Sequence, residues 1–206
     1  MRTEKEFLEY INHIKEMAAM EGYDSLDETY VEHLRCRYFG HDVVIGRTGR
    51  IVLREIKIDD LEAFYDFSDA ETEPVLKQFL KGSKEESKDY LQAYISSMYQ
   101  LYDYGIWTIE DGKTGAVLGL CGFGRMEFEG EAVTDLGYYI RPEKRRTGLA
   151  TEAVRIALEY GKEYIELSEV YARVRKDNEA SIRVLCKFGF EKIQSHETCY
   201  VYKKCE

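Results

Sequence analysis

Two arginines and a glycine in the stretch from Asp135 to Ala150 have the types and spacing of an anion-binding loop. Arg145 and Arg146 place fixed positive charge just before Gly148, where an apolar run with helical spacing begins. A helix that begins there leaves its first backbone N–H groups without internal partners, and its dipole favours negative charge at that end. Because Gly148 and Ala150 have small side chains, a phosphate can approach the backbone closely. The stretch therefore predicts a cradle for a pyrophosphate group.

The same residues fit a family motif. Residues 145–150 read RRTGLA, which matches the pattern Q/R-x-x-G-x-G/A of the GNAT N-acetyltransferases. From about Ile51 to about Lys203 the chain resembles the ribosomal-protein-alanine N-acetyltransferase (RimJ/RimL-like) branch of that family. Three blocks carry the resemblance, in order: IVLREIKIDDLEAF, LGYYIRPEKRRTGLATEAV and NEASIRVLCKFGFEKI. The resemblance implies an N-acetyltransferase that takes acetyl-CoA as co-substrate. Its acceptor would be a primary amine, either a protein N-terminus or a small cationic molecule.

The resemblance also implies which residues bind coenzyme A. Backbone N–H groups from Arg146 to Thr151 would contact the pyrophosphate. The preceding strand would run beside the pantetheine arm, with one N–H directed at the thioester carbonyl. Asn178, in the family's N-x-x-S/A motif, would contact the same arm and is also placed to cap the helix that follows it. The predicted cofactor-binding residues are Tyr138, Tyr139, Ile140, Arg145, Arg146, Thr147, Gly148, Leu149, Ala150, Thr151, Asn178 and Ser181.

The catalytic acid and base are less clearly marked. An amine with a pKa near ~10 is mostly protonated at neutral pH, so a group must accept its proton. Some relatives have a tyrosine seven residues after the motif asparagine, where this chain has Leu185; others have a glutamate five residues before it, where this chain has Arg173. Asp135, just before LGY, is the best remaining carboxylate. It could accept the proton, orient a water molecule, bind the amine's charge, or simply be an exposed strand-end residue. Tyr138 is the second catalytic candidate, as an acid.

Composition limits the class of protein. The chain has 206 residues, 44% hydrophobic and 33% charged, which is typical of one globular domain with an appendage. A net charge of −10 argues against nucleic acid as a partner. No apolar run reaches the roughly 18 residues of a membrane span, and the charged N-terminus is unlike a signal peptide, so we expect a cytoplasmic protein without a membrane partner. The five scattered cysteines predict free thiols, and the four histidines lack metal-ligand spacing, so no metal is expected.

The expected elements position these residues. Residues 1–45 form a helical extension, with helices at Thr3–Met20 and Asp27–Arg35, which would either cap the main domain or act as a dimer arm or a wall of the substrate site; a homodimer is a further expectation. Residues 46–206 form the acetyltransferase domain. Its strands and helices follow the order β–α–α–β–β–β–α–β–α–β–β, with Asp59 as the N-cap of one helix and a loop at Pro74.

This order predicts an α/β (α+β) fold with a mixed central sheet and helices on both faces. The resemblance implies that the sheet is splayed between the family's fourth and fifth strands. The leading functional hypothesis is acetyl transfer by direct attack of the amine in a ternary complex. The alternative is a noncatalytic acyl-CoA-binding module, which would bind coenzyme A without turning it over. A nucleotide-binding protein is a third alternative, but G-x-G-x-x-G and Walker A motifs are absent from the sequence.

Overall fold

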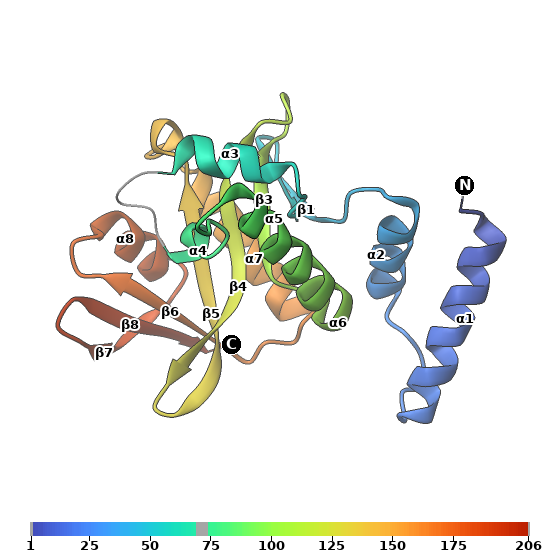
Figure 1. Ribbon diagram of the computed structural model, residues 1–206. Helices are drawn as coiled ribbons and strands as arrows, with labels where there is room; N and C mark the ends of the chain where they lie inside the picture. The colour runs from blue at the N-terminus through green and yellow to red at the C-terminus, as the bar shows by residue number, and fades with distance from the viewer. Residues whose placement is uncertain (1, 69–73, 206) are drawn as a thin grey trace. The chain divides into compact units, whose positions relative to one another are not determined.

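The computed structural model describes residues 2–68 and 74–205, which divide into two compact units, Met1–Val43 and Val44–Glu206 (Figure 1). Within those described ranges, every helix is too short or too polar to cross a lipid bilayer. The N-terminal unit is a pair of helices, and the second unit holds the sheet and all the residues predicted to bind coenzyme A.

The N-terminal unit consists of α1 (Glu4–Met20) and α2 (Glu28–Phe39). Thr3 begins α1 with a reciprocal capping box, in which its hydroxyl accepts the N–H of Glu6 while the Glu6 carboxylate accepts the N–H of Thr3. The second helix is longer than predicted because nothing interrupts it before Gly40, whose left-handed φ of 76° ends it. The small core of this unit contains Phe7, Ile11 and Leu34.

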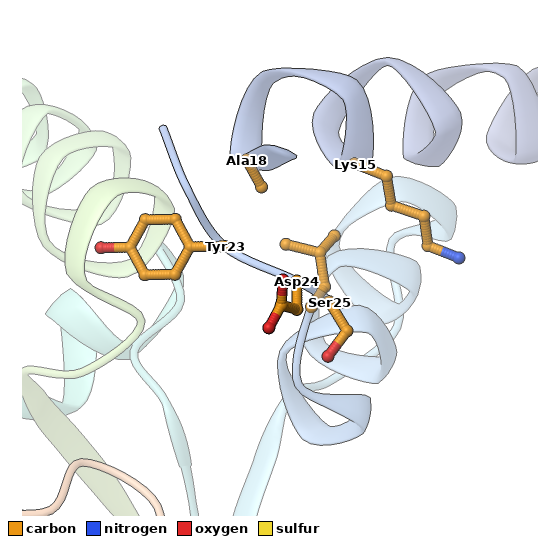
Figure 2. Close-up of a pocket in the computed structure, with 6 residues that line it drawn as sticks. Lys15, Ala18, Tyr23, Asp24 and Ser25 are labelled. Carbon is orange, nitrogen blue, oxygen red and sulfur yellow. The ribbon is translucent and has the colours of Figure 1, made fainter. Parts of the chain in front are cut away.

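A surface pocket of about 250 Å³ lies in this unit, where the C-terminal part of α1 meets the segment that leads to α2 (Figure 2). Its lining residues are Lys15, Ala18, Tyr23, Asp24, Ser25 and Leu26. None of them belongs to the predicted site.

The second unit is built on one mixed sheet. Its strands are β1 (Val44–Arg47), β2 (Ile51–Glu55), β3 (Ile106–Asp111), β4 (Val117–Phe128), β5 (Glu131–Ile140), β6 (Glu169–Arg175), β7 (Glu191–Ser195) and β8 (Cys199–Cys205). Within the described residues, the order across the sheet is β1-β2-β3-β4-β5-β6-β8-β7. The β5–β6 pair is parallel and all other neighbours are antiparallel.

Helices cover both faces of this sheet (Figure 1). They are α3 (Asp60–Phe67), α4 (Pro74–Lys77), α5 (Lys84–Tyr94), α6 (Gln100–Tyr102), α7 (Leu149–Glu163) and α8 (Glu179–Lys187), with a π-helical turn at Ile95–Tyr99 and a 3₁₀ turn at Pro142–Lys144. One hydrophobic core packs α3, α4 and α5 against one face, and a second packs α7 and α8 against the other. The predicted α/β fold with helices on both faces is therefore confirmed.

Two local predictions differ from the structure. Pro74 begins the short helix α4 rather than a loop, a position where its missing N–H costs nothing. Asp59 occupies the N-cap position of α3 but makes no capping bond with its side chain. The polar stretch from Glu127 to Thr134 belongs largely to β4 and β5, which form a long hairpin.

The first N–H groups of α3, those of Asp60 and Leu61, bond to the carbonyls of Lys57 and Ile58, and the Asp60 side chain belongs to a buried charged cluster. The buried Asp60 carboxylate accepts both Nη1 and Nη2 of the buried Arg54, each at 2.8 Å. It also accepts the hydroxyl of Thr108 at 2.7 Å and the backbone N–H of Lys57 at 2.9 Å. Arg54 donates from Nε to Glu110 at 2.6 Å. This charged cluster, in which every named group has partners, joins β2, β3 and the start of α3.

The sheet opens between β5 and β6. These are the fourth and fifth strands in the family's numbering, because the labels used here also count the short edge strand β1. The described residues of β4 and β5 form ten register pairs, from Gly119↔Ile140 to Phe128↔Glu131. By contrast, β5 and β6 share a single pair, Asp135↔Tyr171. Beyond that pair the strands diverge, and the predicted splay is confirmed.

Candidate active site

The turn between β5 and α7 has the backbone geometry of an anion cradle. Gly148 is the N-cap of the 15-residue helix α7 and has a φ of 87°, a conformation that residues with a side chain rarely adopt. Glycine provides no capping side chain, so the N–H groups of the first turn, from Leu149 to Thr151, are not covered by the residue before them. Capping side chains are present at α1, α2, α5 and α8. The uncapped start of α7 is therefore suited to an anionic ligand.

Side chains from outside the turn hold it in place. Arg50, just before β2, donates from Nη1 to the carbonyl of Thr147 at 3.0 Å and from Nε to the Glu152 carboxylate at 2.8 Å. Thr48 donates to the other oxygen of Glu152 at 2.7 Å. The Thr147 hydroxyl donates back to the carbonyl of Lys144 at 2.6 Å. Sequence reasoning missed Arg50, since it lies 97 residues away from Thr147 and belongs to no motif.

The two motif arginines differ in setting. Arg145 donates from Nε to the carbonyl of Ile140 at 3.0 Å, and its guanidinium lies 5.1 Å from the ring centroid of Tyr139. Arg145 is thereby fastened to the end of β5. Arg146 is exposed and has a φ of 61°. Both cations lie in the exposed turn that leads into α7.

The backbone directions of β5 distinguish the three residues predicted to pair with pantetheine. Arg141 donates its N–H to Leu118 of the β4 side, and a Cβ built on Gly119 would lie 2.0 Å from the carbonyl oxygen of Tyr139. Successive residues of an antiparallel strand direct their backbone groups to alternate sides. The backbone of Tyr139 therefore faces β4, whereas Tyr138 and Ile140 face the side where the sheet opens.

Tyr138, Asn178 and Ser181 are brought together on the face covered by α8. The Tyr138 hydroxyl lies 2.6 Å from Oγ of Ser181, and Oδ1 of Asn178 accepts the Ser181 N–H at 3.1 Å. Asn178 is thus the N-cap of α8. This cluster connects β5 to α8 across the opening in the sheet.

Asp135 lies on the opposite face from the Tyr138 side chain, because side chains alternate along a strand. Gly137, on the same face as Asp135, lies beneath Val75 of α4, and a Cβ built on Gly124 would lie 3.0 Å from Oδ1 of Asp135. Partial burial raises the pKa of the Asp135 carboxyl above its ordinary value, while the Arg173 guanidinium opposes that rise. A carboxylate with a raised pKa is a better proton acceptor near neutral pH.

The other candidate positions are occupied by groups without acid–base function. Leu185 is 1% exposed and packs in the core under α8, and Arg173 lies on β6 with an exposed side chain. Cys121 on β4 is fully buried, which raises the pKa of its thiol and disfavours the reactive thiolate. Of the titratable side chains on this part of β5, Asp135 and Tyr138 are the two catalytic candidates and lie on opposite faces, while the buried Tyr139 hydroxyl donates to the carbonyl of Phe67.

These residues fit coenzyme A on three observations: the uncapped α7 N-terminus at Gly148, the two arginines before it, and an opening in the sheet beside Tyr138 and Ile140. The first two suit a pyrophosphate, and the third suits an extended chain with amide groups.

Comparison with known proteins agrees with this geometry. Residues 50–191 match the family model described as an acetyltransferase (GNAT) domain. The chain is 34% identical to the uncharacterised N-acetyltransferase YoaA of Bacillus subtilis over 149 residues, which is 72% of this chain and 83% of that protein. It is 41% identical to the spermidine N(1)-acetyltransferase of Escherichia coli over 51 residues, 25% of this chain and 27% of that enzyme. The structure superimposes on RimL, a ribosomal alpha-N-protein acetyltransferase solved with coenzyme A, with a TM-score of 0.59 and 16% identity, covering 79% of this chain and 97% of RimL.

The chain belongs to the GNAT family of acetyltransferases. It is an N-acetyltransferase, the class in which acetyl-CoA is the acetyl donor.

Proposed function

We propose that the domain formed by residues 46–206 transfers an acetyl group from acetyl-CoA to a primary amine by direct attack in a ternary complex. The observation that carries the proposal is the uncapped N-terminus of α7 at Gly148, next to the point where β5 and β6 part after their single register pair. The residues of the cradle and of the opening would hold the two ends of one extended donor.

Each group of residues has a separate task. The first-turn N–H groups of α7, with Arg145 and Arg146, would neutralise the pyrophosphate. The backbone of Tyr138 and Ile140 would pair with the pantetheine arm, and one N–H would stabilise charge on the carbonyl oxygen, an effect of about 3–4 kcal/mol for a well-placed donor. When bound, acetyl-CoA supplies an acetyl group activated as a thioester.

Asp135 would take the proton of the attacking amine, directly or through water. The amine nitrogen forms the new bond to the acetyl carbon, the carbon–sulfur bond breaks, and the coenzyme leaves as a thiolate that is protonated from solvent. Holding both reactants in one site supplies much of the rate, so the chemistry does not need an acid at the position of Leu185.

The acceptor is proposed to be a protein N-terminus or a small cationic amine. RimL, by its name, acts on a ribosomal protein, and the relative from Escherichia coli acts on spermidine. A protein N-terminus and the terminal amine of spermidine are both primary amines that carry positive charge in solution. A positively charged acceptor suits a site with a carboxylate at Asp135.

The test is acetyl-CoA consumption, followed by the thiol released, with a panel of amines: N-terminal peptides with different first residues, spermidine, an aminoglycoside and free amino acids. We expect one class to give turnover well above the rate without amine. Tight coenzyme A binding by calorimetry with no turnover on any amine would instead support a noncatalytic acyl-CoA-binding module, which the core position of Leu185 favours.

Replacing Asp135 with asparagine is expected to lower kcat about 100-fold, with little change in the affinity for acetyl-CoA, because the amide keeps the shape but cannot accept the proton. Steady-state kinetics at several pH values measure this effect. Glu131→Gln, which neutralises an exposed carboxylate on the same strand and face, is the matched control and should keep wild-type kcat. Unchanged kcat in Asp135→Asn at every pH would remove Asp135 from proton transfer.

A further inference from the structure

The tip of the β4–β5 hairpin is attached to β6 beside Asp135. Figure 1 shows this hairpin extending past the end of the sheet. Near its tip, the Phe128 ring lies 5.2 Å from the Tyr171 ring on β6. Two residues further along β6, Nη2 of Arg173 donates to the backbone carbonyl of Glu127 at 3.3 Å. Tyr171 is the register partner of Asp135, so both attachments lie at the point where the sheet begins to open.

The side chains of Asp135, Tyr171 and Arg173 share one face of the sheet. Register partners in a parallel pair point to the same face, and so do residues two apart on one strand. Two neighbours of Asp135 on this face are glycines, since Gly124 is its register partner on β4 and Gly137 lies two residues further along β5. Arg173 therefore shares a face with Asp135, and its positive charge lowers the pKa of this carboxyl, against the effect of burial.

We propose that Arg173 is a positioning residue for catalysis: it ties the β4–β5 hairpin to β6 and holds a positive charge on the face of the sheet that carries Asp135. The inference rests on the proposed function, in which Asp135 accepts the proton of the amine. The proposal gives a role to Arg173, which occupies the position where the family resemblance implies a glutamate. In this chain the carboxylate of Asp135 is on β5 and the cation of Arg173 is on β6.

The charges around Asp135 determine the expected pH response. The residues that face it are Gly124 on β4, Val133 and Gly137 on its own strand, Val75 of α4 next to Gly137, and Tyr171 and Arg173 on β6. Behind Tyr171, Glu169 and Lys203 form an ion pair at 2.5 Å. In this set Arg173 is the cation that acts directly on Asp135. Its removal should leave the effect of burial on Asp135 unopposed and raise the pKa of the carboxyl further.

The experiment measures kcat for acetyl-CoA with the best amine of the panel between pH 5 and 9, in the wild type, Arg173→Met and Arg173→Lys. We expect the low-pH limb of Arg173→Met to move to higher pH, with about tenfold lower kcat on that limb and near-wild-type kcat at pH 9. Arg173→Lys, which keeps the charge, should restore the limb. Arg125→Met, which removes a cation from the opposite face of β4, is the control and should leave the profile unchanged.

A readout that does not depend on turnover is the carboxyl ¹³C titration of Asp135 by NMR, assigned with Asp135→Asn. The pKa of that carboxyl should rise in Arg173→Met and return in Arg173→Lys. An unchanged pKa, or a fall in kcat that is equal at every pH, would overturn the positioning role. If the wild type acetylates no amine of the panel, the proposed function fails, and that failure is visible before any variant is compared.

Discussion

Replacing Asp60 with alanine is expected to lower the free energy of unfolding of the second unit by about 3–5 kcal/mol, because it leaves the Arg54 guanidinium buried with one charged partner. Arg54 and Asp60 have side chains that are only 4% and 5% exposed, and the carboxylate accepts hydrogen bonds from three different residues. Removing it leaves the Thr108 hydroxyl and the Lys57 N–H without this acceptor. Urea unfolding followed by circular dichroism measures the change.

Two further variants separate the charge effect from the loss of packing. Asp60→Leu combined with Arg54→Met should recover part of the loss, since a buried ion pair replaced by apolar side chains is often close to neutral. The exposed pair of Arg183 with Glu179, 70% and 80% exposed, is the control, and Arg183→Ala should change stability by less than about 0.5 kcal/mol. If Asp60→Ala proves as mild as Arg183→Ala, the buried cluster does not stabilise this unit.

Replacing Gly148 with glutamate is expected to weaken coenzyme A binding at least about 100-fold, equivalent to about 3 kcal/mol. A carboxylate at the N-cap would lie next to the N–H groups that are proposed to hold the pyrophosphate. Its negative charge would repel the negatively charged pyrophosphate at close range. The φ of 87° adds strain for any residue with a side chain, and a Cβ there would lie 3.4 Å from Nη2 of Arg50. Isothermal titration calorimetry with coenzyme A measures the loss.

Gly148→Asn is the matched control for backbone strain, because asparagine tolerates the left-handed conformation and has no charge. We expect it to bind more weakly than wild type but much more tightly than Gly148→Glu. Thermal unfolding of both variants should remain cooperative, which shows that the fold is retained. Wild-type affinity in a folded Gly148→Glu protein would exclude the turn before α7 from the coenzyme A site.

The elements of the second unit were predictable because their signals are local. The apolar period after Gly148 predicted α7, which begins at Leu149. The ends of β4 and β5 were not predictable, because the tip of their hairpin is polar and is held by contacts with Tyr171 and Arg173 on a later strand. Long-range contacts of this kind leave no periodic pattern in the sequence.

The candidate site, too, could be predicted from the sequence only in part. The turn at Gly148 and the start of α7 could be predicted, since these residues are consecutive and the left-handed backbone there favours glycine; coenzyme A binding at this turn stays a prediction. Arg50 could not, because one arginine in a hairpin gives no signal of its distant partners. The opposite faces of Asp135 and Tyr138 follow from their odd spacing on one strand and are predictable from the sequence alone. The bond from Tyr138 to Ser181 depends on where α8 lies, which the sequence alone does not determine.

The single register pair between β5 and β6 also affects how this unit folds. From β1 to β6 each strand neighbours the one before it in the chain, so the first five strands can pair from N- to C-terminus by antiparallel contacts between successive segments. The β1–β2, β3–β4 and β4–β5 contacts close short loops, which favours rapid folding, whereas the helices α3 to α6 separate β2 from β3 in the chain. The last three strands then add as a second group, through one parallel junction at Asp135 and Tyr171. The junction between these two groups of strands is therefore also the place proposed to receive acetyl-CoA. A ligand bound there would contact both groups, which backbone hydrogen bonds join at one register pair.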